Sequence, residues 1–126
     1  MTIIGIGIDI LEIQRIKKIL SKRKILFAKH ILSNKELKKF LVSKEQARFL
    51  AKRFSIKEAA AKALGTGIRE KITFNQFEIY NDRYGKPFLK FLKVAKKISS
   101  ILLIKKIHIS ISDEKKYVSS IVIYEN

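Results

Sequence analysis

The chain opens with apolar residues that alternate along the sequence. In the segment Ile3 to Ile10, one face carries Ile4, Ile6, Ile8 and Ile10, and the other carries Ile3, Gly5, Gly7 and Asp9. Successive side chains of a strand point to opposite faces, so this alternation predicts a β-strand. The glycines beside Asp9 are typical of a bulge or a close backbone crossing, and they also suit a strand that leaves room for a ligand.

Apolar residues at helical spacing follow in three segments. These are Leu11 to Ser21, a segment announced by Ser33-Asn34-Lys35-Glu36, and the long run Lys44 to Leu64. Ser33 with Glu36 and Ser43 with Gln46 match the capping box, so they predict the starts of the second and third helices. Gly65 is expected to end the long helix at the C′ position.

The second half of the chain returns to strand patterns. Strands are predicted for Thr73 to Tyr80, Phe88 to Leu92, Ile107 to Ser112 and Tyr117 to Tyr124, with a short helix at Val94 to Leu102. The turns between paired strands are Asn81 to Pro87 and Asp113 to Lys116. This order predicts an α+β fold, a mainly antiparallel sheet with a long central helix packed on it, in a single domain of residues 1–126.

Composition fits a folded protein with no membrane span. Hydrophobic residues make up 47% of the chain, which is too many for a disordered one. No apolar run reaches the roughly 18 residues of a transmembrane helix. There is no cysteine, so disulfides and thiol chemistry are excluded, and a cytoplasmic location is expected.

The net charge of +17 comes from 28 Lys and Arg against 11 Asp and Glu. Such an excess attracts polyanions and acidic proteins. A general bias of the sequence toward Lys and Ile explains the charge equally well, so charge alone does not choose a partner. A small basic nucleic-acid-binding domain is the alternative function, although the chain has no helix-turn-helix signature, zinc module or RRM-type aromatic pattern.

Glu58 interrupts the apolar stripe of the long helix. At about 100° per residue, it falls inside the arc formed by Ala47, Leu50, Ala51, Phe54 and Ala61. An ionised carboxylate directed at a core is costly unless it is paired or binds a metal. Glu58 is therefore predicted to be a functional group whose partner is a cation.

Asp9 and Glu58 together would form a minimal Mg²⁺ site if the long helix crosses the first strand. Mg²⁺ is commonly held by one or two carboxylates with water and substrate phosphates. Asp9 is equally suited to cap the helix that begins near Leu11. Lys62, four residues after Glu58, has the spacing of an ordinary helical ion pair. Lys57 and Arg53 lie on the other flank of the stripe, and such a rim of cations suits phosphate groups.

Other familiar sites are excluded. The segment Gly5 to Ile10 does not match G-x-G-x-x-G, and no P-loop motif occurs. Two histidines without cysteine make a structural zinc site implausible. His108 lies on the polar side of its strand, where a solvated face and a phosphate contact are both open.

Taken together, the motifs resemble the holo-acyl-carrier-protein synthase family of the 4′-phosphopantetheinyl transferase superfamily. The matching segments are Gly5 to Ile16, Phe49 to Gly67 with Lys57-Glu58-Ala59, Phe77 to Asp82, Gly85-Lys86-Pro87 and His108 to Glu114. They span nearly the whole chain in the family's order. Ile8, where the family often has Thr, and Lys93, where it often has Gly, are mild departures.

The resemblance implies Mg²⁺-dependent transfer of 4′-phosphopantetheine from coenzyme A to a serine of apo-acyl carrier protein, in support of fatty acid biosynthesis. Asp9 and Glu58 would bind the metal, while Glu58 and Lys62 would act in proton transfer and charge neutralisation. Phosphate and nucleotide contacts are expected from Arg53, Lys57, Gly65, Gly85, Pro87 and His108. It also implies a cyclic homotrimer with active sites between subunits, and docking of the carrier protein on the first helix through Arg15.

Overall fold

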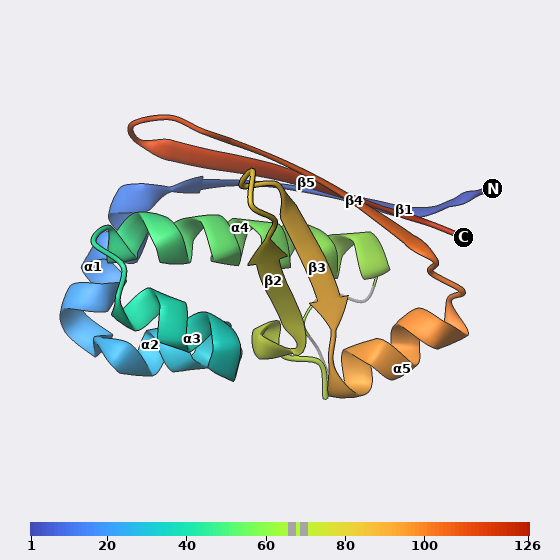
Figure 1. The fold of residues 1–126 in the computed structure, drawn as a ribbon, viewed down its shortest axis with the longest axis horizontal. Helices are drawn as coiled ribbons and strands as arrows, with labels where there is room; N and C mark the ends of the chain where they lie inside the picture. The colour runs from blue at the N-terminus through green and yellow to red at the C-terminus, as the bar shows by residue number, and fades with distance from the viewer. Residues whose placement is uncertain (66–67, 69–70) are drawn as a thin grey trace.

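The computed structural model describes residues 1–65, 68 and 71–126. Its helices are α1 (Ile13–Arg23), α2 (Ile25–Ile31), α3 (Asn34–Leu41), α4 (Gln46–Leu64) and α5 (Lys93–Ile101), with a short 3₁₀ turn at Phe74–Gln76. Its strands are β1 (Ile3–Glu12), β2 (Phe77–Asn81), β3 (Pro87–Phe91), β4 (Lys106–Asp113) and β5 (Tyr117–Glu125). The α+β class predicted from the sequence is confirmed (Figure 1).

The strands form two antiparallel sheets where the sequence suggested one. The larger sheet has the order β1-β5-β4, so β1 and β4 are its edges and the C-terminal strand is its centre. β2 and β3 form a separate hairpin in which Phe77 pairs with Phe91 and Asn81 with Pro87. Figure 1 shows this hairpin crossing α4 at a steep angle.

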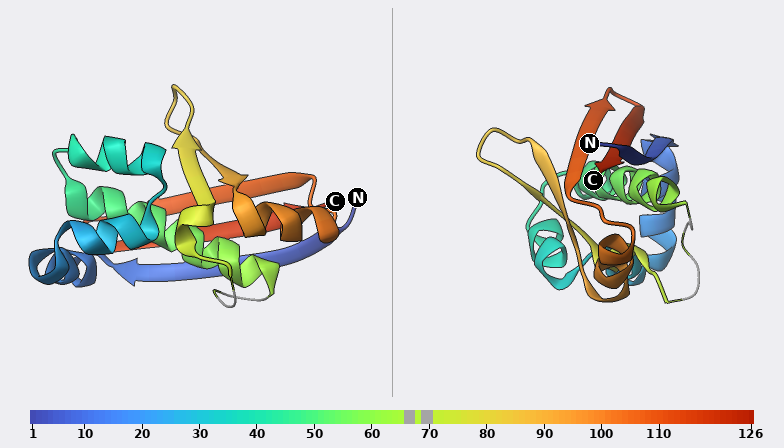
Figure 2. Two further views of the ribbon diagram at one scale, coloured as in Figure 1. Left: turned by 90° about the horizontal axis from the view of Figure 1, so that it is seen from below. Right: turned by 90° about the vertical axis from the view of Figure 1, so that its right-hand side faces the viewer.

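The long helix α4 is the centre of the molecule. It lies between the three-stranded sheet on one side and a layer of α1, α2, α3, the β2–β3 hairpin and α5 on the other (Figures 1 and 2). Small residues Ala59, Ala60 and Ala63 are buried on it, so the helix packs closely on both layers. The predicted long central helix is confirmed, although it begins two residues later than expected.

The glycines of β1 permit a close crossing of two backbones. A Cβ atom on Gly5 would overlap the carbonyl oxygen of Ala63, and one on Gly7 would overlap that of Ala59. Such an overlap of a side-chain carbon with backbone cannot be relieved without moving α4 off the sheet. Of the roles left open by the sequence, backbone crossing is therefore the one that these glycines have in the structure.

Two of the predicted helix ends are confirmed and one is wrong. Ser33 accepts from the Glu36 amide while the Glu36 carboxylate accepts from the Ser33 amide, which completes a capping box. Gly65 ends α4 with φ of 81°, as expected for a C′ glycine. The capping box at Ser43 does not form, because α4 begins at Gln46 and the Ser43 hydroxyl accepts from the nearer Glu45 amide.

One helix was missed, and one departure from the family falls at an unusual backbone conformation. The short helix α2 was missed, because Lys24 to Leu32 is too short to display a clear apolar period. Lys93 has φ of 50°, in the left-handed region that favours glycine. Lys therefore replaces the family's common Gly at a position whose backbone conformation suits glycine. In the described part of the chain, no helix has the length and apolarity to cross a membrane.

Candidate functional site

The crossing of β1 and α4 brings Asp9 and Glu58 to one edge of the sheet. Gly5 and Gly7 lie under the helix backbone, and Asp9 is the next residue of β1 on the same face. Lys62 reaches over this edge from one helical turn beyond Glu58. Its Nζ donates to the Ile8 carbonyl oxygen at 3.0 Å and lies 3.6 Å from Asp9 Oδ1.

Charges from three other residues act on Glu58. Burial raises the pKa of the Glu58 carboxyl above its usual value, and the nearby charge of Asp9 raises it further, while Lys62 and Arg15 lower it. The two carboxylates therefore repel each other across a half-buried site with cations on its rim. A divalent cation that both carboxylates contact would relieve this repulsion.

Asp9 is not a helix cap in the structure, and Lys62 is not the ion-pair partner of Glu58 that its spacing predicted. β1 continues to Glu12, which is the N-cap residue of α1, so Asp9 does not cap that helix. Lys62 pairs with Asp9, whereas the simple spacing argument paired it with Glu58. Both side chains are thus directed at the same edge site.

Glu58 does not point into the core as the helical stripe suggested. It is half-buried at the flank of α4, beside β1. The buried charges of this helix are Arg53 and Lys57, and Lys57 is completely inaccessible. Lys57 donates to Glu36 Oε1 at 2.5 Å and to the Ile31 carbonyl oxygen at 2.6 Å. Burial lowers the pKa of the Lys57 ammonium to about 8, against the opposing effect of Glu36.

This burial corrects the expected rim of cations. Lys57 has no exposed surface for a phosphate group, because its ammonium is enclosed by Glu36 and Ile31. Arg53 is also largely buried; it donates from Nη2 to Asn81 Oδ1 at 3.1 Å and packs over the Phe49 ring at 4.8 Å. The sequence pattern could not reveal this, since the partners come from α3 and β2.

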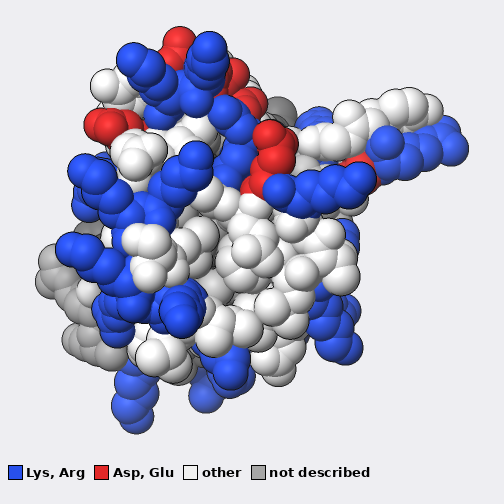
Figure 3. Space-filling model, turned by 90° about the vertical axis from the view of Figure 1, so that its left-hand side faces the viewer, with Lys and Arg blue, Asp and Glu red and all other residues white. Residues whose placement is uncertain are grey.

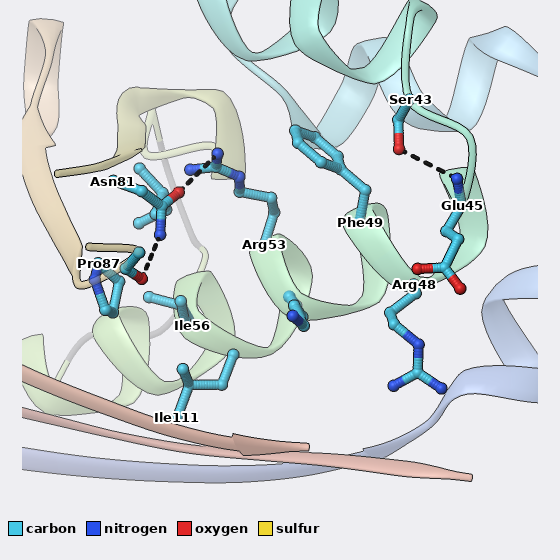
Figure 4. A pocket seen from close by; sticks show the side chains of 12 residues that line it. Ser43, Glu45, Arg48, Phe49, Arg53, Ile56, Asn81, Pro87 and Ile111 are labelled. Carbon is cyan, nitrogen blue, oxygen red and sulfur yellow. Dashed lines mark hydrogen bonds between the residues drawn. The ribbon is translucent and has the colours of Figure 1, made fainter. Parts of the chain in front are cut away.

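A cavity of about 370 Å³ lies on the opposite flank of α4. Figure 4 shows that its walls come from α4, the β2–β3 hairpin and β4. Its lining residues are Ser43, Glu45, Arg48, Phe49, Lys52, Arg53, Ile56, Ile79, Asn81, Gly85, Pro87 and Ile111. Three residues expected to bind a nucleotide, namely Arg53, Gly85 and Pro87, therefore meet in one cavity. Gly85 has φ of 86°, and its carbonyl oxygen accepts from Asn81 Nδ2 at 3.0 Å.

The remaining predicted site residues are dispersed. His108 is exposed on β4, and its Nε2 lies 3.4 Å from Glu125 Oε1. Gly65 lies at the end of α4, and Arg15 in α1 is close enough to Glu58 to affect its pKa. Thr66 and Gly67, the end of the long motif, lie outside the described residues.

One chain therefore carries two half-sites on opposite edges of the three-stranded sheet. The carboxylate half-site, Asp9, Glu58 and Lys62, lies at the β1 edge. The cavity half-site, which includes Arg53, Gly85 and Pro87, lies at the β4 edge, where Ile111 forms part of its wall. α4 lies between the two.

Comparisons with known proteins agree on one family. The family model of the 4′-phosphopantetheinyl transferase superfamily matches residues 5–122. The chain is 55% identical over 126 residues to the holo-[acyl-carrier-protein] synthase of Buchnera aphidicola from Acyrthosiphon pisum, with full coverage of both chains.

Solved structures give the same result. The crystal structure of holo-[acyl-carrier-protein] synthase from Neisseria meningitidis superposes with a TM-score of 0.93 at 38% identity, covering 99% of this chain and 100% of that one. The Bacillus anthracis holo-(acyl-carrier-protein) synthase in complex with CoA (3′,5′-ADP) superposes with a TM-score of 0.81 at 36% identity, covering 97% and 96%.

Proposed function

The chain belongs to the 4′-phosphopantetheinyl transferase superfamily, and on this basis we propose that it modifies an acyl carrier protein through the site at Asp9 and Glu58. The reaction transfers 4′-phosphopantetheine from coenzyme A to a serine of the apo-carrier protein. Adenosine 3′,5′-bisphosphate is released. The single observation that carries this assignment to particular residues is the meeting of Asp9, Glu58 and Lys62 at the β1–α4 crossing.

Asp9 and Glu58 are the residues that would hold Mg²⁺. Within the described part of the chain, no group of three or more His, Cys, Asp or Glu side chains meets. Two carboxylates nevertheless fit Mg²⁺, which completes its shell with water and substrate phosphate oxygens. When bound, the metal would neutralise charge on the diphosphate of coenzyme A.

Glu58 and Lys62 are the residues that move protons and stabilise charge. The hydroxyl oxygen of the carrier serine bonds to the β-phosphorus, and Glu58 accepts the proton that this hydroxyl loses. The raised pKa of Glu58 suits a general base. The bond from that phosphorus to the oxygen bridging to the α-phosphate breaks. Lys62, whose exposed ammonium lies 3.6 Å from Asp9, stabilises the negative charge that develops on the leaving phosphate.

The adenosine part of coenzyme A would occupy the cavity lined by Arg53, Gly85 and Pro87. The Gly85 backbone and the Pro87 ring form one wall, and Arg48 and Lys52, which both also contact Asp113, lie at the cavity. Lys57 is left out of this assignment because it is buried in its ion pair. His108 and Gly65 remain proposed contacts to phosphate and to the backbone wall of the site.

A homotrimer with sites between subunits is part of the proposal. The two half-sites lie on opposite sheet edges, so a cyclic arrangement would join the β1 edge of one copy to the β4 edge of the next. On the sheet face away from α4, Ile6, Ile8 and Ile10 are 56%, 63% and 69% exposed. A row of exposed isoleucines on a sheet supports contact with another protein surface.

The carrier protein would dock on α1 close to Arg15. Figure 3 shows Lys and Arg side chains dominating the end of the molecule that α1, α2 and α3 form. Complementary potentials speed association and orient an acidic partner. This use of the positive charge replaces nucleic-acid binding, which offers no role for Asp9 and Glu58. Fatty acid biosynthesis in the cytoplasm is the proposed setting.

The test is the mass of an apo-carrier protein incubated with the enzyme, coenzyme A and Mg²⁺. A mass increase of one phosphopantetheine group is expected with the native chain and a loss of it with Glu58→Ala. Glu114→Ala, which removes an exposed carboxylate in the turn between β4 and β5, is the matched control and should still modify the carrier. No modification by the native chain, or equal modification by Glu58→Ala, would refute the assignment.

A further inference from the structure

Glu36 has an unusual place for a carboxylate, because only 2% of it is exposed and its contacts reach two other elements besides the start of its own helix. Its Oε1 accepts from Lys57 Nζ and from the Ser33 amide. Its Oε2 accepts from the Ile79 amide at 3.3 Å and lies 3.7 Å from Arg53 Nη1. One side chain of α3 thus contacts both α4 and β2.

Two of the residues that Glu36 contacts line the nucleotide cavity, although Glu36 itself does not. Arg53 forms part of the α4 wall and Ile79 part of the hairpin wall. The polar contacts continue from Arg53 to Asn81 and from Asn81 to the Gly85 carbonyl oxygen, at 3.1 and 3.0 Å. A connected series of contacts therefore leads from the buried carboxylate to the turn that closes the cavity.

The hairpin has few other polar ties to α4. β2 and β3 do not pair with the three-stranded sheet that packs on α4. Backbone hydrogen bonds between strands therefore do not fix the distance of the hairpin from this helix. Phe77, Ile79 and Leu89 of the hairpin pack in the hydrophobic core beside α4, but such packing is non-directional. Glu36 adds a directional contact, because its carboxylate accepts a hydrogen bond from the Ile79 amide of the hairpin while its charge faces Arg53 of α4, and such contacts are suited to set the position of the hairpin.

We propose that Glu36 is a positioning residue for coenzyme A binding. By holding Arg53 and the Ile79 amide, it fixes the separation of α4 and the β2–β3 hairpin and thus the width of the nucleotide cavity. It takes no part in phosphoryl transfer. This inference rests on the proposed function, since it assigns the cavity to the adenosine part of coenzyme A.

The first test is Glu36→Gln, which retains the side-chain volume and the capping box. Removing the charge weakens the contacts to Arg53 and Lys57, so the hairpin is held less firmly. We expect the KM for coenzyme A to rise by about tenfold, because the ion pair that orients Arg53 at the cavity is lost. The kcat and the KM for the carrier protein should stay within about twofold of the native values.

A second variant guards against unfolding caused by an unpaired Lys57. Glu36→Gln combined with Lys57→Met replaces the buried ion pair with neutral groups of similar size, a change that cores often accept. The double variant still lacks the carboxylate that holds Arg53. It should therefore show the same rise in KM for coenzyme A, and calorimetric titration with coenzyme A should show the same loss of affinity.

Tyr124→Phe is the control for a purely structural effect. Tyr124 is as deeply buried as Glu36 and donates to the Ala60 carbonyl oxygen of α4 at 2.8 Å, but it does not line the cavity. This variant should lose thermal stability while retaining the native KM for coenzyme A.

Three outcomes would overturn the inference: a folded Glu36 variant with unchanged KM, a fall in kcat alone, or unfolding of both variants, which would make Glu36 a residue of stability only. These outcomes are distinct from failure of the proposed function, because the native chain would then not modify the carrier at all.

Discussion

Glu58 and Lys57 are adjacent in the chain, but their charges have opposite environments in the structure. Lys57 is enclosed in an ion pair with Glu36, so its charge is satisfied within the protein. Glu58 is half-buried beside a second carboxylate, so its charge is opposed within the protein. A group that is held in an unfavourable ionisation state at neutral pH is typical of a functional site.

Glu58→Gln should therefore raise the stability of the protein at neutral pH while it removes the transferase activity. The pKa of Glu58 is higher in the folded chain than in the unfolded one, so above both values its ionisation costs the folded state free energy. The gain should be present at pH 7 and disappear below the ordinary glutamate pKa, where both states are protonated. Thermal unfolding of native and variant protein at pH 7 and at pH 4 measures it. An equal or lower melting temperature at pH 7 would contradict this account.

At the scale of elements, the crossing of α4 over β1 decides where the site forms. Gly5 and Gly7 leave no space between the strand and the backbone of the helix. Ser119 of β5 fixes the strand further by donating to the Asp9 carbonyl oxygen at 3.2 Å. The distance between Asp9 and Lys62 follows from this close approach, and not from any local preference of either residue.

Gly7→Ala should destabilise the protein by about 3 kcal/mol, because the new methyl group overlaps the Ala59 carbonyl oxygen and forces α4 away from β1. Urea denaturation followed by far-ultraviolet circular dichroism measures this free energy of unfolding. Ser110→Ala, an exposed change in strand β4, serves as the control and should stay within about 0.5 kcal/mol. A stable Gly7→Ala protein with a normal Mg²⁺ requirement would show that the close crossing is not needed.

At the scale of the whole molecule, the separation of the two half-sites is the main finding. The carboxylates lie at the β1 edge and the cavity lined by Arg53, Gly85 and Pro87 at the β4 edge, with α4 between them. The exposed isoleucines of β1 lie on the sheet face away from α4. Both observations support an active site that two copies of the chain complete.

Two inactive variants should restore activity when they assemble together. Glu58→Ala disables the carboxylate half-site, and Arg53→Met disables the cavity half-site while retaining apolar packing. Co-expressed in equal amounts, they should recover about a quarter of native activity, since random pairing joins two intact half-sites at that frequency. Glu58→Ala co-expressed with Asp9→Asn is the control and should stay inactive. The absence of restored activity in purified mixed assemblies would place the whole site in one chain.

The sequence by itself determined those features that depend on local patterns. Alternation predicted β1 and the C-terminal hairpin, helical spacing predicted α4, and Gly65 marked its end, because these signals come from residues close together in the chain. The motifs around Asp9 and Glu58 identified the family, and the comparisons confirmed it. The short helix α2 and the start of α4 were missed or displaced, since capping and propensity are weak signals over a few residues.

Only the tertiary structure decided which charges are buried and which half-site each residue joins. Lys57 and Glu58 are neighbours in the helical pattern, which does not show which of them is buried. Glu36 of α3 pairs with the buried Lys57, and Asp9 of β1 lies near the half-buried Glu58. The two roles open to the β1 glycines were likewise settled by Ala59 and Ala63 on the crossing helix. The physical reason is the same in each case: desolvation and close contact depend on residues distant in the chain, and a local pattern carries no information about them.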